Sequence, residues 1–379
     1  MGDVQHSSLV DDPRSVDVAL IERELTSLWK EAGTLDDDGL PVVRACSLNL
    51  LVLTDNERQA SELDSVLAEI AIAHPCRIFL VTAENETDSP LLEAWVSARC
   101  SIPLPGEKQV CCEQVNLSAR GADVSKVPSV ITSLLVPDVP VVLFWKSGMS
   151  HPGNMVDALV GVSDHLITDS RHDRAPLPGF VKFEMLIADR EGRTTCGDLA
   201  WSRLGPWRRI LGDFFEPGEM RGHLRKLNRL EIEYSTDPAS MQSGLSAAML
   251  LTGWFGHSLG WCIERLITEN SGGEYRAIFR LGDKKIIVDI RESSRSESSA
   301  GCMETVVLEA PANFRLTIEA TEHREWFRLQ GRGGAGVEDL HVRNPDDVEL
   351  LVRELENPFT DQTYRSSLRP VVGAMKEEI

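Results

Sequence analysis

Residues 134–146, LLVPDVPVVLFWK, contain the stretch that decides the fold of this chain. Its apolar run, residues 139–145, is followed by the polar Lys146. A strand with one face in water alternates apolar and polar residues, whereas a strand covered on both faces does not. The run therefore predicts a central strand of a parallel sheet with helices on both sides. Proline has no N–H to give to a neighbouring strand, so we expect Pro140 at the first residue of this strand.

The first half of the chain alternates between apolar runs and helical spacing. Short connections between such elements are typical of right-handed crossovers in a parallel, Rossmann-like sheet. Residues 110–117 alternate more than the others, which predicts an edge strand or antiparallel pairing. The expected strands are residues 44–53, 77–81, 110–117 and, as the last of the sheet, 165–168; the expected helices are 15–32, 63–74, 91–98, 124–135 and 155–160.

The second half changes to alternating strands, which are typical of a sheet with one face in water. Gly282 and Asp283 predict a hairpin turn, and residues 344–347 (NPDD) predict a helix start. The expected strands are residues 230–234, 275–281, 285–290, 305–308, 314–320 and 337–343; the expected helices follow residue 180 and span 198–215 (kinked or split at Pro206), 244–267 and 348–355.

The fold class is therefore α/β: an N-terminal Rossmann-like, largely parallel sheet with flanking helices, and a C-terminal α+β domain with a mostly antiparallel sheet. The expected organisation is an N-terminal helical segment (residues 1–43), a Rossmann-like domain with trailing helices (44–215) and the C-terminal domain (216–379). Residues 169–179, DSRHDRAPLPG, have the composition of a linker.

Composition excludes several classes of function. The 379 residues carry a formal net charge of -20 at pH 7. This charge opposes binding to nucleic acid or to an anionic membrane surface and is compatible with binding to a cationic patch on a protein partner. The N-terminus lacks the basic start and apolar core of a signal peptide, and no stretch is long and apolar enough to span a bilayer. We therefore expect a soluble, cytoplasmic protein.

A search for catalytic and cofactor motifs returns little. There is no Walker loop, zincin motif, nucleophile elbow or calcium loop. Residues 331–336, GRGGAG, match a dinucleotide fingerprint but precede a predicted strand rather than a helix, which favours a turn. The first strand is followed by TDNE (54–57), whose acids would repel a pyrophosphate. We expect no cofactor, no metal and no catalytic residue.

Three groups of residues remain as candidates, each with a plainer explanation. Cys111 and Cys112 could form a redox switch, but neighbours on a strand point to opposite faces, so two half-buried packing groups are favoured. The chain's eight cysteines, without Cys-x-x-Cys pairs, predict neither a disulfide framework nor a zinc site. His151, Asp164, His165 and His172, with Asp169, could form a polar cleft at the carboxyl ends of the strands; scattered loop residues are favoured.

The third group lies in the helix expected over residues 198–215. Trp201, Arg203, Trp207 and Arg208, with the neighbouring Arg209, are of the residue types that anchor protein interfaces. Tryptophans that fill the protein's own core are an equally good interpretation.

Several stretches resemble the OpcA family of glucose-6-phosphate dehydrogenase assembly proteins. They are RACSLNLLVL (44–53), HPCR (74–77), CEQ (112–114), LLVPDVPVVLFW (134–145), DLAWSRLGPWRRILGDFF (198–215) and LLTGWFGHSLGW (250–261). Their order and number make the resemblance fairly specific, and they run over most of the chain.

The resemblance implies a non-catalytic partner that promotes assembly or activation of glucose-6-phosphate dehydrogenase, the entry enzyme of the oxidative pentose phosphate pathway. In photosynthetic members it also implies thiol-dependent regulation, which we assign to no particular cysteine. The alternatives are an enzyme of sugar-phosphate metabolism, such as a lactonase-like hydrolase with its site near Asp164, His165 and His172, or a sugar-phosphate-binding sensor.

Overall fold

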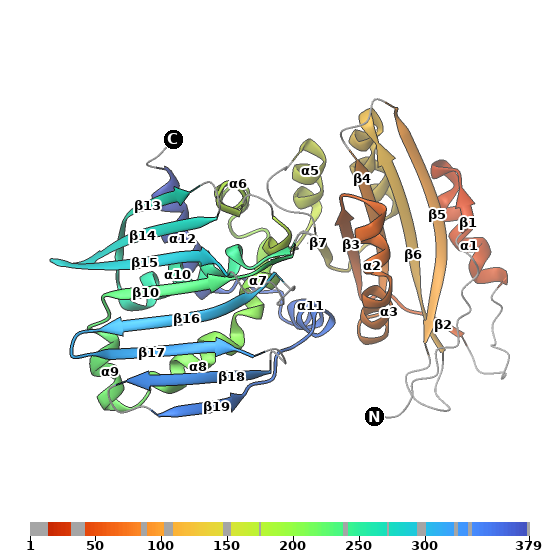
Figure 1. Cartoon of the computed structure of the whole chain (residues 1–379). Coiled ribbons are helices and arrows are strands. Elements are labelled where there is room, and N and C mark those ends of the chain that lie inside the picture. Colours follow the sequence, from red (N-terminus) through yellow and green to blue (C-terminus); the bar gives the residue numbers. More distant parts are fainter. Residues whose placement is uncertain are drawn as a thin grey trace.

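A computed structural model describes most of the chain and shows two sheets joined by helices (Figure 1). The described residues are 14–31, 42–84, 89–101, 109–146, 153–173, 176–237, 242–270, 273–293, 301–321, 325–332 and 336–376. Among them, no helix is both long and apolar enough to cross a membrane.

The first sheet is largely parallel, as the sequence predicts. Its strand order is β1-β5-β6-β4-β3-β7-β8-β9, with the short β2 paired to β6. Pairing is antiparallel only at β1–β5 and β5–β6 among the described strands. The strands are β1 (Arg14–Val16), β2 (Val42–Arg44), β3 (Leu48–Thr54), β4 (Cys76–Glu84), β5 (Leu91–Ser101), β6 (Gln109–Arg120), β7 (Val141–Trp145), β8 (His165–Thr168) and β9 (Thr195–Asp198).

The stretch at 134–146 forms β7, which is buried over its whole length between β3 and β8. Pro140 immediately precedes the strand, where its missing N–H costs no ladder bond. Both faces of the sheet are covered because β7 and its neighbours contribute side chains to separate apolar clusters on each face. The covering helices of the first half are α1 (Ile21–Glu31), α2 (Glu57–Glu62), α3 (Asp64–Ala73), α4 (Val127–Leu134), α5 (Asn154–Val162) and α6 (Pro176–Ala188).

Two predictions for this half are wrong. Residues 91–98, expected as a helix, belong to β5, whose Ala94 and Val96 pack under α1 while Glu93 faces out. β8 is not the last strand, because β9 pairs beyond it in parallel. The strand β6 lies inside the sheet, and its antiparallel pairing with β5 is one of the two explanations that its alternation predicted.

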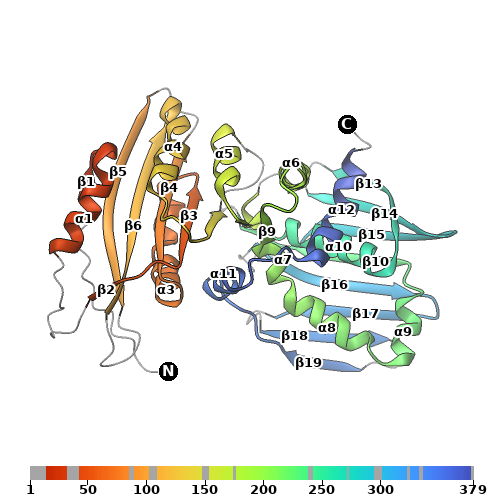
Figure 2. The same ribbon diagram turned by 180° about the vertical axis from the view of Figure 1, so that it is seen from behind.

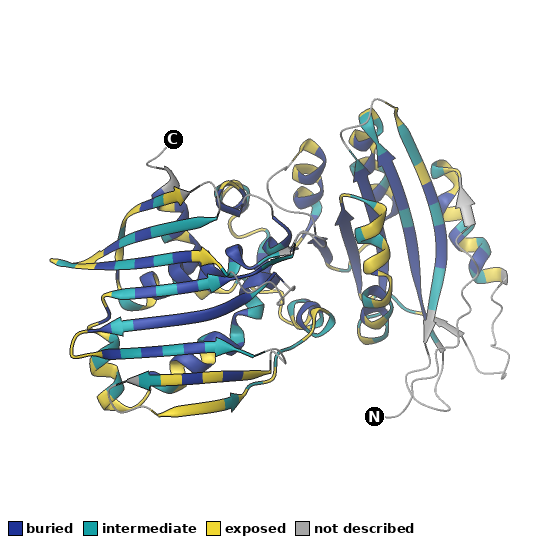
Figure 3. Cartoon of the chain, in the orientation of Figure 1, coloured by how far each residue is buried: buried dark blue, intermediate teal, exposed yellow. Residues whose placement is uncertain are grey.

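The second sheet is antiparallel except where β10 pairs with β15, and its order is β13-β14-β15-β10-β16-β17-β18-β19. Its burial alternates along most strands, so one face is packed and the other is more exposed (Figure 3). The strands are β10 (Arg229–Tyr234), β13 (Cys262–Asn270), β14 (Glu274–Leu281), β15 (Lys284–Glu292), β16 (Met303–Ala310), β17 (Phe314–Ala320), β18 (Trp326–Arg332) and β19 (Val337–His341); β11 (Thr236–Asp237) and β12 (Gln242–Ser243) form a separate pair.

Helices cover only the packed face of this sheet, which is visible from behind in Figure 2. The long α10 lies on it because residues such as Leu250, Leu251 and Phe255 are buried nearly all round the helix. Figure 1 looks onto the uncovered face. The helices of this half are α7 (Leu199–Arg203), α8 (Gly205–Phe215), α9 (Gly218–Leu224), α10 (Leu245–Leu259), α11 (Asp347–Glu356) and α12 (Gln362–Lys376).

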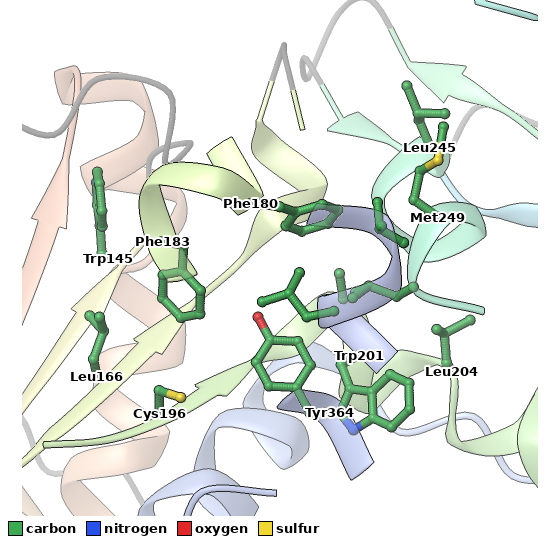
Figure 4. Close-up of a cluster of buried hydrophobic side chains, with 14 of the residues drawn as sticks. Trp145, Leu166, Phe180, Phe183, Cys196, Trp201, Leu204, Leu245, Met249 and Tyr364 are labelled. Carbon is green, nitrogen blue, oxygen red and sulfur yellow. The ribbon is translucent and has the colours of Figure 1, made fainter. Parts of the chain in front are cut away.

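The two halves interlock through the last two helices. Leu350, Leu351 and Leu355 of α11 join the apolar cluster of the first sheet, and α12 packs on α6 and α10. Tyr364 of α12 is fully buried, with ring centroids 6.4 Å from Phe183 and 5.9 Å from Trp201 (Figure 4). The C-terminal helices therefore complete the core of the N-terminal half.

Boundaries in the second half differ from the prediction in specific ways. The helix expected over 244–267 ends at Leu259, because Gly260 takes a left-handed conformation (φ 68°) and the chain continues as β13. The helix over 198–215 is split before Pro206 into α7 and α8, one of the two outcomes expected. Residues 169–173 are mostly buried rather than an exposed linker, and α12 was not predicted. Of the stretch 331–336, Gly331 and Arg332 are the last residues of β18, and the N–H of Gly331 donates to the carbonyl of Gly336 at 3.2 Å, just before β19; residues 333–335 lie outside the described residues.

Candidate functional site

The candidate site lies where the carboxyl ends of β8 and β9 meet the start of α11. Carboxyl ends of parallel strands gather at one edge of a sheet, where α/β proteins commonly bind ligands. Asp169 follows β8 directly and precedes a short 3₁₀ helix, η3 (Ser170–His172). Asp198 ends β9 and caps α7. These turns place two buried carboxylates side by side at this edge.

Asp169 is held by a two-pronged ion pair. Its carboxylate oxygens accept hydrogen bonds from Nη1 and Nη2 of Arg203 at 2.7 and 2.9 Å, and only 3% of the residue is exposed. Burial alone would raise the pKa of Asp169, but the attraction of Arg203 and Arg171 outweighs it, so the pKa lies well below its ordinary value. Asp169 is therefore ionised near neutral pH.

A second carboxylate completes this cluster from the far end of the chain. Asp347, the first residue of α11, accepts from Arg203 Nη2 at 2.8 Å and from Arg171 Nη2 at 2.8 Å. Desolvation alone would raise the pKa of Asp347, but the two guanidiniums outweigh it and lower the pKa, although about half of the side chain remains exposed. Arg171, Arg203, Asp169 and Asp347 thus form two balanced positive and negative pairs, which we call the junction cluster.

Asp198 has a different role beside this cluster. It accepts from the backbone N–H of Ser170 at 3.1 Å and of Ala200 at 2.9 Å, and the Tyr364 hydroxyl lies 3.4 Å from its other oxygen. Because it is fully buried, its pKa is raised to about 6. Asp198 therefore fastens η3, α7 and α12 to one another.

A cavity of about 530 Å³ opens over the junction cluster. Its walls are largely apolar, with Leu204, Trp207, Met303 and Phe327 among them, and the Trp207 and Phe327 rings meet edge to face at 5.1 Å. Arg171 and Arg203, whose side chains are largely buried, line its floor, and Glu325, Asp346 and Asp347 are exposed at its rim. We call this cavity the junction pocket.

The chemistry available in the junction pocket is that of binding. Both guanidiniums are ion-paired with Asp169 and Asp347, which neutralises their charge, although Nε of Arg171 has no hydrogen-bond partner among the described residues. Within the described parts of the chain, no cluster of three or more His, Cys, Asp or Glu side chains is arranged to hold a metal ion. Apolar walls with a few convergent charges are typical of binding sites.

The expected interface residues lie inside the molecule. Trp201 is 3% and Trp207 6% exposed. Trp201 donates from Nε1 to Asp361 Oδ2 at 2.7 Å and is covered by the Arg208 guanidinium, 3.7 Å from the ring. Arg203 belongs to the junction cluster. Core packing, the alternative left open by the sequence, is what the structure shows for both tryptophans, and Trp207 also lines the junction pocket.

The expected polar cleft does not form as a unit. Asp164 and His165 lie at the amino end of β8, at the opposite edge of the sheet from His172. His165 shares a 2.7 Å hydrogen bond with Thr195, and Asp164 accepts from the backbone N–H of Val141. The closeness of these residues in sequence suggested a cluster, but β8 lies between them, so Asp164 and His165 are at one end of the strand and His172 is beyond the other. His151 lies outside the described residues.

Of the two described histidines in this group, His172 lies beside the junction cluster. Its Nε2 is 3.7 Å from Asp169, yet its pKa is lowered to about 4 because burial outweighs that attraction. Burial likewise lowers the pKa of His165 to about 4. Both imidazoles are therefore neutral near pH 7, and His172 adds no positive charge to the site.

The two adjacent cysteines differ from each other. Cys112 is buried with an intact thiol, and burial raises its pKa to about 11. Cys111 is disulfide-bonded, which is a correction to the expectation of two packing groups. The residue opposite Cys111 on β5 is Cys100. The sequence could not reveal this because the pairing register of β5 and β6 is a tertiary property.

The loop after β3 has the character predicted for it. The Asn56 side chain accepts from the backbone N–H of Gln59 at 3.0 Å, and the Gln59 side chain accepts from the backbone N–H of Asp55 at 3.0 Å. The N–H groups that would face a pyrophosphate at the start of α2 are thus partly satisfied by the chain itself. The acidic Glu57 in the first turn adds repulsion.

Sequence reasoning missed the most important part of the site. Asp347 appeared only as an acid at a predicted helix start, and nothing in its surroundings pointed to Arg171 or Arg203. The signal that could have been used is weaker: an aspartate directly after each of two buried strands, Asp169 and Asp198, at an edge where ligands bind.

Comparison with known proteins identifies the family. Residues 67–184 match the glucose-6-phosphate dehydrogenase subunit N-terminal domain, and residues 194–368 match the C-terminal domain of the same subunit. The chain belongs to the OpcA family. The first match ends within α6 and the second begins just before β9. The second family domain therefore includes the last strand of the first sheet, together with Arg203 and Asp347 of the junction cluster, whereas Asp169 and Arg171 lie in the first.

The chain is similar to two proteins of this family along part or most of its length. The chain is 28% identical over 86% of its length to "Putative OxPP cycle protein OpcA" of Synechococcus elongatus, of which it covers 73%. The protein of the same name from Nostoc punctiforme is 28% identical over 55% of this chain, and the match spans 42% of that relative.

Solved structures that resemble the chain are distant. They include an oxidoreductase domain protein from Kribbella flavida (9% identity, 88% of this chain and 98% of that one, TM-score 0.47). Another is scyllo-inositol dehydrogenase from Lactobacillus casei (10% identity, 87% and 95%, TM-score 0.44). At these values the likeness carries no argument about function.

Proposed function

We propose that this chain is a non-catalytic partner of glucose-6-phosphate dehydrogenase that promotes its assembly or its activity in the oxidative pentose phosphate cycle. The observation that carries the proposal is membership of the OpcA family over both halves of the chain. A ligand or partner shifts an equilibrium only through a difference in affinity for the two states. The chain would therefore bind the active or assembled form of the dehydrogenase more tightly.

The geometry of the site supports a binding role. The charged groups at the strand ends, where a reactive site would be sought, neutralise one another in the junction cluster. Asp198 is occupied with backbone N–H groups, which is a structural use of a buried carboxylate. The alternative, a lactonase-like hydrolase, was expected to have its site near Asp164, His165 and His172. These residues do not lie together, because Asp164 and His165 are separated from His172 by the length of β8.

The test is a titration of the purified chain into the dehydrogenase of the same organism, with NADPH formation and the mass of the complex followed together. We expect a saturable rise in activity and a new, heavier species. An equal concentration of an unrelated acidic protein is the control. A dehydrogenase whose rate and mass stay unchanged, with no complex detected, would refute the proposal.

The same titration separates assembly from activation. Assembly obeys mass action, so its effect fades when the dehydrogenase is concentrated enough to assemble alone. Activation by preferential binding persists at every dehydrogenase concentration. Repeating the titration over a hundredfold range of dehydrogenase concentration distinguishes the two modes.

A further inference from the structure

The junction pocket has no part in the family assignment, yet it is a largely apolar cavity of about 530 Å³. It lies between α7 and α8 on one side and β16 and β18 on the other. Its aromatic wall, Trp207 with Phe327, is held edge to face and is nearly buried. Such a rigid, apolar recess is suited to a single apolar side chain, because deep packing in a desolvated pocket is how interface anchors gain most of their energy.

The charges around the pocket determine which residue types of a partner can lie next to that apolar side chain. Three carboxylates line it, those of Glu325, Asp346 and Asp347, against the two guanidiniums of Arg171 and Arg203. The guanidiniums are turned to Asp169 and Asp347. Glu325 and Asp346 are exposed at the rim, where Glu325 lies 3.4 Å from His341 Nε2 and one oxygen of Asp346 caps α11, so both carboxylates keep an oxygen facing solvent-accessible space. The rim is therefore acidic and attracts a cation, and it repels a phosphate or a carboxylate.

We propose that the junction pocket receives an apolar side chain of the partner dehydrogenase that stands next to a lysine or arginine, with the basic group against Glu325 and Asp346. This inference rests on the proposed function and names the surface through which it acts. The chain's overall charge of -20 favours the same complementarity. A sugar phosphate is a poor occupant, since the three carboxylates of the lining outnumber its two guanidiniums, both of which are ion-paired.

Two substitutions with matched controls test the pocket. Ala320→Phe fills it from the end of β17, where Ala320 is half-buried in its lining; Ala73→Phe places the same ring at the exposed end of α3. We expect Ala320→Phe to raise the concentration needed for half-maximal effect on the dehydrogenase at least about tenfold, as loss of an anchor pocket does. Ala73→Phe should leave it unchanged.

The second substitution reverses a charge without touching the core. Glu325→Lys changes an exposed rim carboxylate, and Glu219→Lys makes the same change on the exposed face of α9. We expect Glu325→Lys to weaken binding several-fold and to reduce its dependence on salt, while Glu219→Lys has little effect. Thermal unfolding of each variant checks that it is folded. Because Glu325 is exposed, this variant keeps the test decisive even where Ala320→Phe disturbs packing.

A direct readout uses two cysteines of the chain itself. Cys302 lines the pocket and Cys262 is exposed on β13, and neither is in a disulfide. We expect saturating dehydrogenase to slow alkylation of Cys302 and to leave alkylation of Cys262 unchanged. The pocket proposal would be refuted if a complex formed without slowing the alkylation of Cys302 and if both pocket variants formed the complex normally. The proposed function would then still stand. If no complex forms at all, the proposed function itself fails.

Discussion

Arg203, at the end of α7, donates to Asp347, at the start of α11, across 144 residues of sequence, with Nη2 2.8 Å from Oδ1. The same guanidinium grips Asp169 after β8. One side chain therefore connects the carboxyl edge of the first sheet to the helix that returns to cover it. The position of α11, and with it the floor of the junction pocket, depends on this guanidinium.

Removing that guanidinium should be costly. Arg203→Met leaves the carboxylate of Asp169 buried without its main partner, and breaking a buried ion pair on one side typically costs about 3–5 kcal/mol. We expect the free energy of unfolding in urea to fall by that order. Arg209→Met, which removes an exposed i,i+4 pair on α8, should change it by less than about 0.5 kcal/mol. Equal effects of the two substitutions would show that the junction cluster does not brace the fold.

Acid should destabilise the protein partly through His172. Its pKa is about 4 in the folded protein and near 6.5 when exposed, so protonation favours the unfolded chain. The stability due to the neutral imidazole is complete above about pH 6.5 and is lost as the pH falls towards 4, by an amount on the order of 3 kcal/mol. We expect His172→Gln to flatten the pH dependence of urea unfolding between pH 7 and 4. The exposed His257→Gln on α10 is the control; an unchanged slope for His172→Gln would contradict the assignment.

Gly253 is required for the contact of α10 with α12. A Cβ on Gly253 would collide with the backbone carbonyl of Ser367 in α12, so the backbone of one of the two helices would have to shift. We expect Gly253→Ala to lower the melting temperature strongly, at a cost of about 3 kcal/mol. Gly212→Ala on α8 meets nothing within 4 Å and should stabilise by up to about 1 kcal/mol through the helix propensity of alanine. Opposite or equal shifts would show that α12 does not lie where the structure has it.

The thiols should react in the order of their exposure. Cys262 is exposed, whereas Cys76, Cys112 and Cys196 are buried with raised pKa values, about 11 for Cys112 and about 12 for Cys196. Since the thiolate is the reactive form, we expect alkylation at pH 8 to modify Cys262 first and the buried three only after unfolding in guanidinium. Mass spectrometry of the modified peptides checks this. Rapid labelling of Cys112 in the folded protein would instead revive it as a redox candidate.

Local sequence carried much of the fold. Residues 139–145 identified a doubly covered strand because a run without alternation has no wet face, and the turn at Gly282 identified the β14–β15 hairpin. Prediction from local sequence failed where the pairing of strands decided the secondary structure. Residues 91–98 have an apolar spacing that fits a helix, yet pairing with β6 makes them a strand. Gly260 ended a helix that hydrophobicity alone extended further.

The sequence by itself determined the layered α/β architecture, the burial of β7 and the acidic character that disfavours nucleic acid. These follow from periodicity and charge, which are local or additive properties of the residues. Only the tertiary structure decided that Asp347 would meet Arg203, that His165 and His172 would lie at opposite ends of β8, and that Trp201 and Trp207 would face inward. Such contacts join residues far apart in the chain, and no local pattern encodes them because they arise from how whole elements pack.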